Sequence, residues 1–265
     1  MIKSLNHFNP REIAGSGQCF RWKELADGTV RIVAFGKCLD IVSRGDSFEL
    51  SCDESEWEAV WAPYLDIDTD YCGIEALIRK SGDAHLLEAF ECGCGIRILR
   101  QDLWEVIISF LISQNNNISR IKGSIEALCR KVGIRAEGDS GEYAFPGPTD
   151  LNPGIFEEVN MGLGYRVPYL KEMYEYAAAH PDWLDSLKSM NYAEARAELL
   201  KHKGIGPKVA DCICLFGLHH IDAFPIDTHV KQLLAKYYPD GFDHEYFKGV
   251  AGVIQQYLFH YELEH

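Results

Sequence analysis

No segment of the sequence approaches the roughly 20 consecutive apolar residues that a membrane-spanning helix needs, so we expect no membrane partner. The first residues, MIKSLNHFNPREI, lack the apolar core of a secretory signal, and we therefore expect a cytoplasmic protein. A paired cysteine framework is missing as well. The 9 cysteines are scattered, which is typical of reduced thiols in the cytosol. Cys92 and Cys94 lie too close together, without a partner pair, to predict a zinc site.

Basic residues are also scarce, because 26 Lys and Arg stand against 40 Asp and Glu and the formal net charge is −14. A basic surface is the usual footprint of a nucleic-acid-binding protein, so the total charge counts against that class. Total charge says little about local fields, however, and a small basic patch stays compatible with it. The 265 residues, 47% of them hydrophobic, suffice for one large or two modest globular domains.

The first 60 or so residues alternate between apolar and polar positions, as half-buried strands do. The runs that predict strands are FRWKEL (20–25), TVRIVAFG (29–36), CLDIVS (38–43) and FELSC (48–52). Turn pairs such as Asp27-Gly28 separate them, and these short spacings predict an antiparallel sheet.

From about residue 65 the apolar residues recur with a helical period. Helices are predicted within 101–113, 118–132, 191–203, 227–238 and 244–261, and a turn-rich loop over 138–154. Asn191 and Glu194 form a capping-box pattern at the start of the third helix. A sheet followed by helices predicts an α+β chain. We divide it into a sheet domain (1–92), a helical domain (93–262) and a probable tag remnant (263–265).

The segment KGIGPKVADC (203–212) predicts a helix that begins near Pro207, directly after a Gly-x-Gly turn. We expect Gly204 and Gly206 to allow close approach of another molecule rather than to satisfy internal packing. Amides at the start of this helix can hold a phosphate without a basic surface, although a plain turn between two helices explains the glycines equally well. Lys208 lies in the first turn, where the helix dipole favours its neutral, nucleophilic form. Asp227 precedes another helix as a natural N-cap. As alternatives to a catalytic role, Lys208 could be an ordinary surface lysine and Asp227 a purely structural cap.

The hairpin with Lys208 and Asp227 resembles the signature of the helix-hairpin-helix DNA glycosylase superfamily, and within it the 8-oxoguanine DNA glycosylases. Four further stretches are similar to motifs of that family: SGQCFRW (16–22), SQNNNISRI (113–121), GLGYR (162–166) and AGVIQQYLF (251–259). Lys203 departs from the family pattern, which commonly has proline there. The resemblance implies that the helical part has the helix-hairpin-helix glycosylase fold.

The resemblance also implies roles for individual residues. Lys208 would attack the sugar and Asp227 would stabilise its developing positive charge. The base pocket would consist of Gly17, Cys212, Gln255 and Phe259. The residues expected to contact DNA are Asn115, Arg120, Tyr165, Arg166, Gly204, Gly206 and His229. The backbone carbonyls of Leu200, His202 and Ile205 would hold a monovalent or divalent cation. Without the family, ordinary core or surface positions explain most of these residues.

The implied partner is double-stranded DNA with 8-oxoguanine opposite cytosine, bound by a monomer that in a prokaryote associates with the nucleoid. The implied activity is base excision followed by strand cleavage, with no required cofactor. The iron–sulfur branch of the superfamily needs four closely spaced cysteines, which are missing after Cys214. The alkylation-repair branch lacks the hairpin lysine. A non-catalytic module that only docks on DNA stays an alternative from another class.

Overall fold

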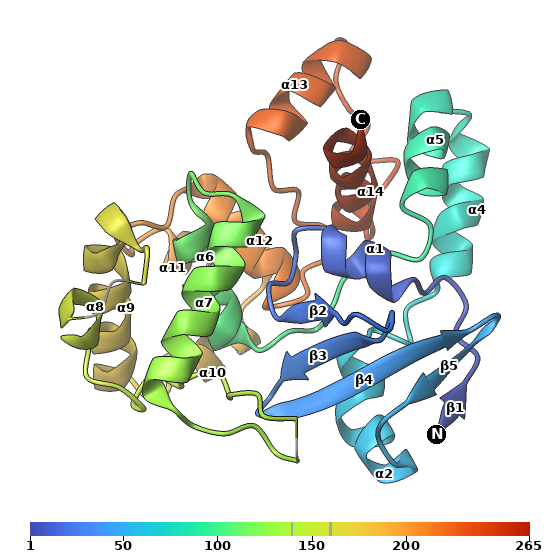
Figure 1. Ribbon diagram of the computed structural model, residues 1–265. Coiled ribbons are helices and arrows are strands. Elements are labelled where there is room, and N and C mark those ends of the chain that lie inside the picture. The colour runs from blue at the N-terminus through green and yellow to red at the C-terminus, as the bar shows by residue number, and fades with distance from the viewer. Residues whose placement is uncertain (139, 159–160) are drawn as a thin grey trace.

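The computed structural model describes residues 1–138, 140–158 and 161–265. An antiparallel sheet forms the N-terminal part and helices form most of the rest, so the α+β prediction is confirmed. Figure 1 shows two groups of helices beside the sheet, one with α6, α7, α11 and α12 and the other with α4, α5 and α14. None of the helices in these ranges is long and apolar enough to cross a membrane.

The sheet has the strand order β1-β5-β4-β3-β2, and every neighbouring pair is antiparallel. Its strands are β1 (Ile2–Lys3), β2 (Trp22–Glu24), β3 (Val30–Ala34), β4 (Lys37–Arg44) and β5 (Ser47–Leu50). The last four form where alternation predicted them. Strand β1 was not predicted, because two residues are too few to show a period of two.

One face of the sheet packs against aromatic side chains from the segment that follows it. Trp57, Trp61 and Tyr64 are buried there with the inward residues of β3 and β4. They lie on three short consecutive helical elements, α2 (Glu54–Glu56), η1 (Trp57–Trp61) and α3 (Ala62–Tyr64). This cluster forms a core separate from the larger helical one.

The remaining helical elements surround the larger core. They are α1 (Pro10–Gly15), α4 (Tyr71–Ser81), α5 (Ala84–Cys92), α6 (Leu103–Ser113), α7 (Ile118–Val132), α8 (Ile155–Glu158), η2 (Gly164–Arg166), α9 (Val167–Ala179), α10 (Trp183–Ser189), α11 (Tyr192–Leu199), α12 (Pro207–Phe216), α13 (Thr228–Tyr237) and α14 (Ala251–Glu264). The capping box at Asn191 and Glu194 is present. The boundary at residue 92 stays a prediction, and α4 and α5 before it share the core of the later helices.

The last helix differs from its prediction over 244–261, because it begins only at Ala251. Gly249 has a φ of +89°, which a right-handed helix does not tolerate, and turns occupy 244–250. Helix α14 is also buried on nearly all sides rather than amphipathic, since it packs against α5 and α13. In the loop predicted over 138–154, residue 139 lies outside the described residues, and the others contain no helix or strand element.

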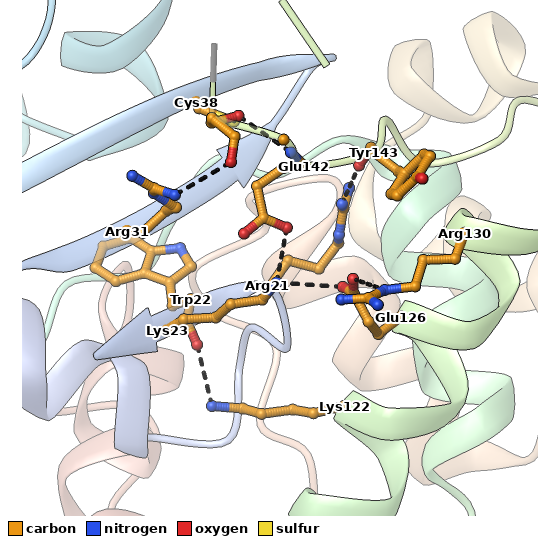
Figure 2. A network of polar contacts seen from close by, with 12 residues as sticks. Arg21, Trp22, Lys23, Arg31, Cys38, Lys122, Glu126, Arg130, Glu142 and Tyr143 are labelled. Atoms are coloured by element: carbon orange, nitrogen blue, oxygen red, sulfur yellow. Dashed lines mark hydrogen bonds and ion pairs between the residues drawn. The ribbon is translucent and has the colours of Figure 1, made fainter. Parts of the chain in front are cut away.

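A polar network joins strand β2 to helix α7 (Figure 2). Lys23 Nζ bonds Glu126 Oε2 at 3.3 Å and Glu142 Oε2 at 2.7 Å, so one ammonium group links the strand, the helix and the segment after it. Lys122 Nζ donates to the Trp22 carbonyl at 3.3 Å. These bonds hold the stretch that begins at residue 16 against α7, the helix that carries Arg120.

Next to Trp22, the buried Arg21 lies near the largely buried Glu105, with 3.9 Å between Glu105 Oε2 and Arg21 Nη1. Burial raises the pKa of Glu105 from 4.5 to about 7, although Arg21 acts in the opposite direction. The tighter binding of the Glu105 proton in the folded state stabilises the fold. This stabilisation is fully present below pH 4.5 and is lost as the pH rises through 7, because between these two pKa values only the folded state still holds the proton. We expect the stability of Glu105→Gln, relative to wild type, to rise by about 1–3 kcal/mol between pH 4.5 and pH 8.

Urea unfolding of both proteins at the two pH values measures this difference. Glu126→Gln is the control, because hydrogen bonds and nearby cations outweigh burial and lower the pKa of Glu126. The stability of Glu126→Gln relative to wild type should fall only slightly between pH 4.5 and pH 8, because the contribution of the wild-type carboxylate is already almost complete at its unfolded pKa of 4.5. If the stability difference between Glu105→Gln and wild type were the same at both pH values, the raised pKa of Glu105 would be contradicted.

Candidate active site

A pocket opens between α12 and α14, and its empty volume, open solvent included, is about 310 Å³. Its lining residues are Gly17, Phe110, Lys208, Cys212, Phe216, Pro225, Asp227, Gln255, Gln256 and Phe259. All six residues predicted for catalysis and the base pocket are among them. These residues come from separate parts of the chain. Figure 1 shows α12 in one helix group, α14 in the other, and the segment after α1 between them.

The turn between α11 and α12 uses its two glycines differently. Gly204 has a φ of +87°, and a Cβ there would lie 2.6 Å from the ring of Tyr169, so internal packing does require this glycine. Our expectation that close approach alone explains both glycines is therefore wrong for Gly204. Gly206 has open space where a Cβ would be, and no side chain in the described ranges caps the helix that starts after it. The first amides of α12 are therefore free to bind an anion.

Lys208 lies half-buried in the first turn of α12, at the pocket wall. Its Nζ is 5.3 Å from the centroid of the Phe110 ring, within cation–π range. One turn further, Cys212 is buried. Burial raises the pKa of this thiol to about 11, although the charge of Lys208 acts the other way. The thiol is therefore neutral at physiological pH, and Lys208 brings an amine to the same wall of the pocket.

Asp227 caps helix α13, as predicted, with Oδ1 accepting from the Val230 amide at 2.9 Å. The same residue lines the pocket with Lys208. The cap fixes the carboxylate, because the helix start orients one of its oxygens. The arrangement therefore places a positioned anion and an amine at one cavity, a combination that suits attack on a carbon that gains positive charge.

Gln255 carries the strongest indication of a missing ligand. Its side chain is 4% exposed, and Oε1 has no hydrogen-bond partner among the described residues. Buried polar atoms are normally paired, so this oxygen indicates a donor that the isolated chain does not supply. One turn further along α14, Phe259 Cε1 would lie 3.1 Å from a Cβ on Gly17, so the ring covers that glycine closely.

Three of the residues predicted to contact DNA are exposed beyond the pocket. Asn115 has a φ of +46°, a left-handed conformation that asparagine tolerates, and it projects from the turn after α6. Arg120 is exposed in the first turn of α7, where Asn117 caps the helix. Tyr165 is 52% exposed, and its hydroxyl donates to the Gln114 carbonyl at 3.1 Å.

Arg166, also predicted to contact DNA, lies in a different setting from these three exposed residues. It is 5% exposed, and its guanidinium donates to the carbonyls of Gln114, Asn115 and Leu163. The side chain thereby ties the turn at 113–117 to the turn at 162–166. Its contact with DNA stays a prediction, for which one Nη1 hydrogen is left over from these bonds.

The remaining predicted residues lie near the hairpin and α13. His229 is exposed in the first turn of α13. At the hairpin, the His202 carbonyl accepts from the Ile205 amide at 3.1 Å. In the described ranges, the carbonyls of Leu200 and Ile205 accept no hydrogen bond. Their oxygen atoms are therefore available as ligands for a cation.

Sequence reasoning missed four lining residues: Phe110, Phe216, Pro225 and Gln256. Phe110 lies in the helix that the apolar period predicted within 101–113, and periodicity does not distinguish a core ring from a pocket ring. Gln256 offered one overlooked signal, because a second glutamine beside Gln255 breaks the apolar run of that helix.

Comparison with known proteins gives consistent results along the chain. Residues 1–107 match the family described as 8-oxoguanine DNA glycosylase, N-terminal domain. The N-glycosylase/DNA lyase of Saccharomyces cerevisiae is 37% identical over 158 residues, which are 54% of this chain but only 42% of that protein. The probable N-glycosylase/DNA lyase of Methanothermobacter thermautotrophicus is 30% identical over 211 residues, covering 68% of this chain and 67% of the relative.

Solved structures extend the match to the whole chain. The Clostridium acetobutylicum 8-oxoguanine glycosylase/lyase, solved with double-stranded DNA containing cytosine opposite 8-oxoguanine, superposes with a TM-score of 0.89. It is 35% identical, and the match covers 99% of this chain and 94% of that one. The fold is therefore shared over nearly the full length of both chains. The chain therefore belongs to the 8-oxoguanine DNA glycosylase/lyase family.

Proposed function

We propose that this protein is a bifunctional DNA glycosylase/lyase that excises 8-oxoguanine opposite cytosine and then nicks the strand. The observation that carries the proposal is the pocket itself, where Lys208 and Asp227 meet the unpaired, buried Oε1 of Gln255. An amine and a carboxylate supply the chemistry, and the glutamine supplies base recognition. The names of the yeast and archaeal relatives and of the clostridial structure support the same activity.

A base inside a duplex is out of reach of such a pocket, so the lesion must be flipped out of the stack. Cys212 and Phe259 would sandwich the flipped base, and Gln255 would pair with its Watson–Crick edge. Oxidised and normal guanine share that edge and differ at N7, which carries a hydrogen only in the lesion. The Gly17 carbonyl would accept that hydrogen and repel the lone pair of guanine.

Lys208 then attacks C1′ of the sugar, and the base leaves with the electrons of the glycosidic bond. Asp227 stabilises the positive charge that develops on the sugar as this bond breaks. Loss of a proton from nitrogen and opening of the ring give a Schiff base to Lys208. Removal of a C2′ proton expels the 3′ phosphate by β-elimination, and water releases the enzyme.

The duplex would be held by the exposed residues beyond the pocket. Asn115 would fill the space of the flipped base, Tyr165 would wedge beside it, and His229 would touch a phosphate. The open amides after Gly206 would bind backbone phosphate with little side-chain charge. This accounts for DNA binding by a chain with a net charge of −14. The hairpin carbonyls of Leu200 and Ile205, which accept no hydrogen bond in the described ranges, would bind a structural cation.

Arg120 should set the preference for the opposite base, because cytosine offers its guanidinium two acceptors. Arg120→Met should narrow the preference for lesion:C over lesion:A by about 1–3 kcal/mol, the usual worth of one good base contact. Single-turnover rate constants on the two duplexes measure the ratio, and Arg130→Met on the exposed face of the same helix is the control. An unchanged ratio in Arg120→Met would remove this residue from recognition.

The proposed function is tested with a labelled duplex that contains a single 8-oxoguanine opposite cytosine. We expect base release and a nick with a β-elimination product at its 3′ end, whereas an undamaged duplex stays intact. Base release without a nick would restrict the protein to glycosylase activity. Binding without either reaction would identify it as a non-catalytic DNA module.

A further inference from the structure

Gln256 lies within the motif AGVIQQYLF but had no predicted role, and it connects the two sides of the pocket. It is 1% exposed on α14, and its Nε2 donates to the Ser16 carbonyl at 2.6 Å. Ser16 immediately precedes Gly17 and is itself fully buried. The bond therefore ties the helix that carries Gln255 and Phe259 to the peptide before Gly17, whose carbonyl is proposed to recognise the lesion.

The chain on the other side of Gly17 is fixed as well. The Gln18 carbonyl accepts from Gln101 Nε2 at 2.8 Å, and the Gln18 side chain bonds the Arg97 carbonyl and the Leu99 amide. Gly17 lies between these anchors with a φ of +76°. Its own carbonyl oxygen accepts no hydrogen bond from any residue that the structure describes.

We propose that Gln256 is a positioning residue that sets lesion recognition by holding the Gly17 carbonyl in place. This inference rests on the proposed function. A carbonyl that must accept a hydrogen from N7 has to stay within a few tenths of an ångström of its position, because hydrogen bonds weaken steeply with distance and angle. Without Gln256, the Ser16–Gly17 peptide loses its only bond from α14, and a glycine between two peptide planes rotates easily.

Other contacts keep α14 in place when this bond is removed. Tyr257 donates its hydroxyl to the Ile96 carbonyl at 3.3 Å, and His260 Nε2 lies 2.8 Å from Glu12 Oε2. Lys208 and Asp227 lie at the starts of α12 and α13, and in the described part of the chain neither forms a hydrogen bond with the Gln256 side chain. Loss of the Gln256 amide should therefore disturb base recognition and leave the lysine chemistry intact.

Gln256→Met keeps the length of the side chain and removes the donor. Two reactions separate recognition from chemistry: excision of 8-oxoguanine opposite cytosine, and cleavage at a preformed abasic site, which offers no base to read. We expect single-turnover excision by Gln256→Met to fall at least tenfold and abasic-site cleavage to stay within twofold of wild type. Tyr257→Phe is the matched control on the same helix, and both of its rates should stay within twofold.

Equal losses in both reactions would mean a general structural role, and an unchanged excision rate would mean no role; either result overturns the proposal. If Gln256→Met does not fold, Gln256→Ala replaces it in the same assays. The preference of each variant for lesion over undamaged duplex, measured by competition in the Lys208→Gln background, should fall in parallel with excision. A wild-type protein that cleaves neither substrate would instead refute the proposed function.

Discussion

Lys208→Gln is expected to lower excision of 8-oxoguanine by more than about a thousandfold, a loss typical of removing a catalytic nucleophile. The amide keeps much of the length of the lysine side chain but cannot attack C1′, so no covalent intermediate forms. Binding of the lesion duplex should persist, because Gln255 and the amides after Gly206 are unchanged. Single-turnover kinetics and a binding isotherm on the same duplex measure the two effects separately.

Lys203→Gln is the matched control, because Lys203 is an exposed lysine in the same hairpin that does not line the pocket. Its excision rate should stay within a fewfold of wild type at fixed ionic strength. If Lys208→Gln retained excision comparable to this control, the nucleophile would have to be another amine or water.

Asp227→Asn should slow base release by about 10²–10³-fold, the cost typical of removing one group that stabilises a transition state electrostatically. The fold should persist, since asparagine caps helices as well as aspartate does and can still accept from the Val230 amide. The melting temperature therefore serves as the internal check. What disappears is the negative charge at the sugar.

Asp83→Asn provides a matched comparison, because Asp83 caps α5 with the same geometry, accepting from the Leu86 amide at 2.9 Å, outside the pocket. It should leave base release unchanged. Should Asp227→Asn release the base at the wild-type rate, only the capping role of Asp227 would survive.

Features with a local cause were predictable from the sequence. The caps at Asn191 and Asp227 and the start of α12 at Pro207 follow from residues within one turn of each other. Strands β2 to β5 follow from alternation over four or more residues. These signals located the hairpin and the lysine correctly without any tertiary information.

Features that depend on distant contacts were not predictable. The bond between Gln256 and Ser16 joins residues 240 positions apart, and no local pattern encodes it. The requirement for Gly204 comes from Tyr169 in another helix. Arg166 was expected at the DNA surface but is buried against backbone carbonyls, a setting that depends on how two turns meet. Helix α14 has almost no exposed face, because neighbouring elements cover it on nearly all sides.

Borohydride trapping of the wild-type protein on a duplex with 8-oxoguanine opposite cytosine tests the central claim most directly. Reduction of the Schiff base should give a stable protein–DNA complex, and peptide mapping should place the DNA adduct on Lys208. The undamaged duplex should give no such complex. Failure to trap a complex during active strand cleavage, or an adduct on any other amine, would contradict the mechanism.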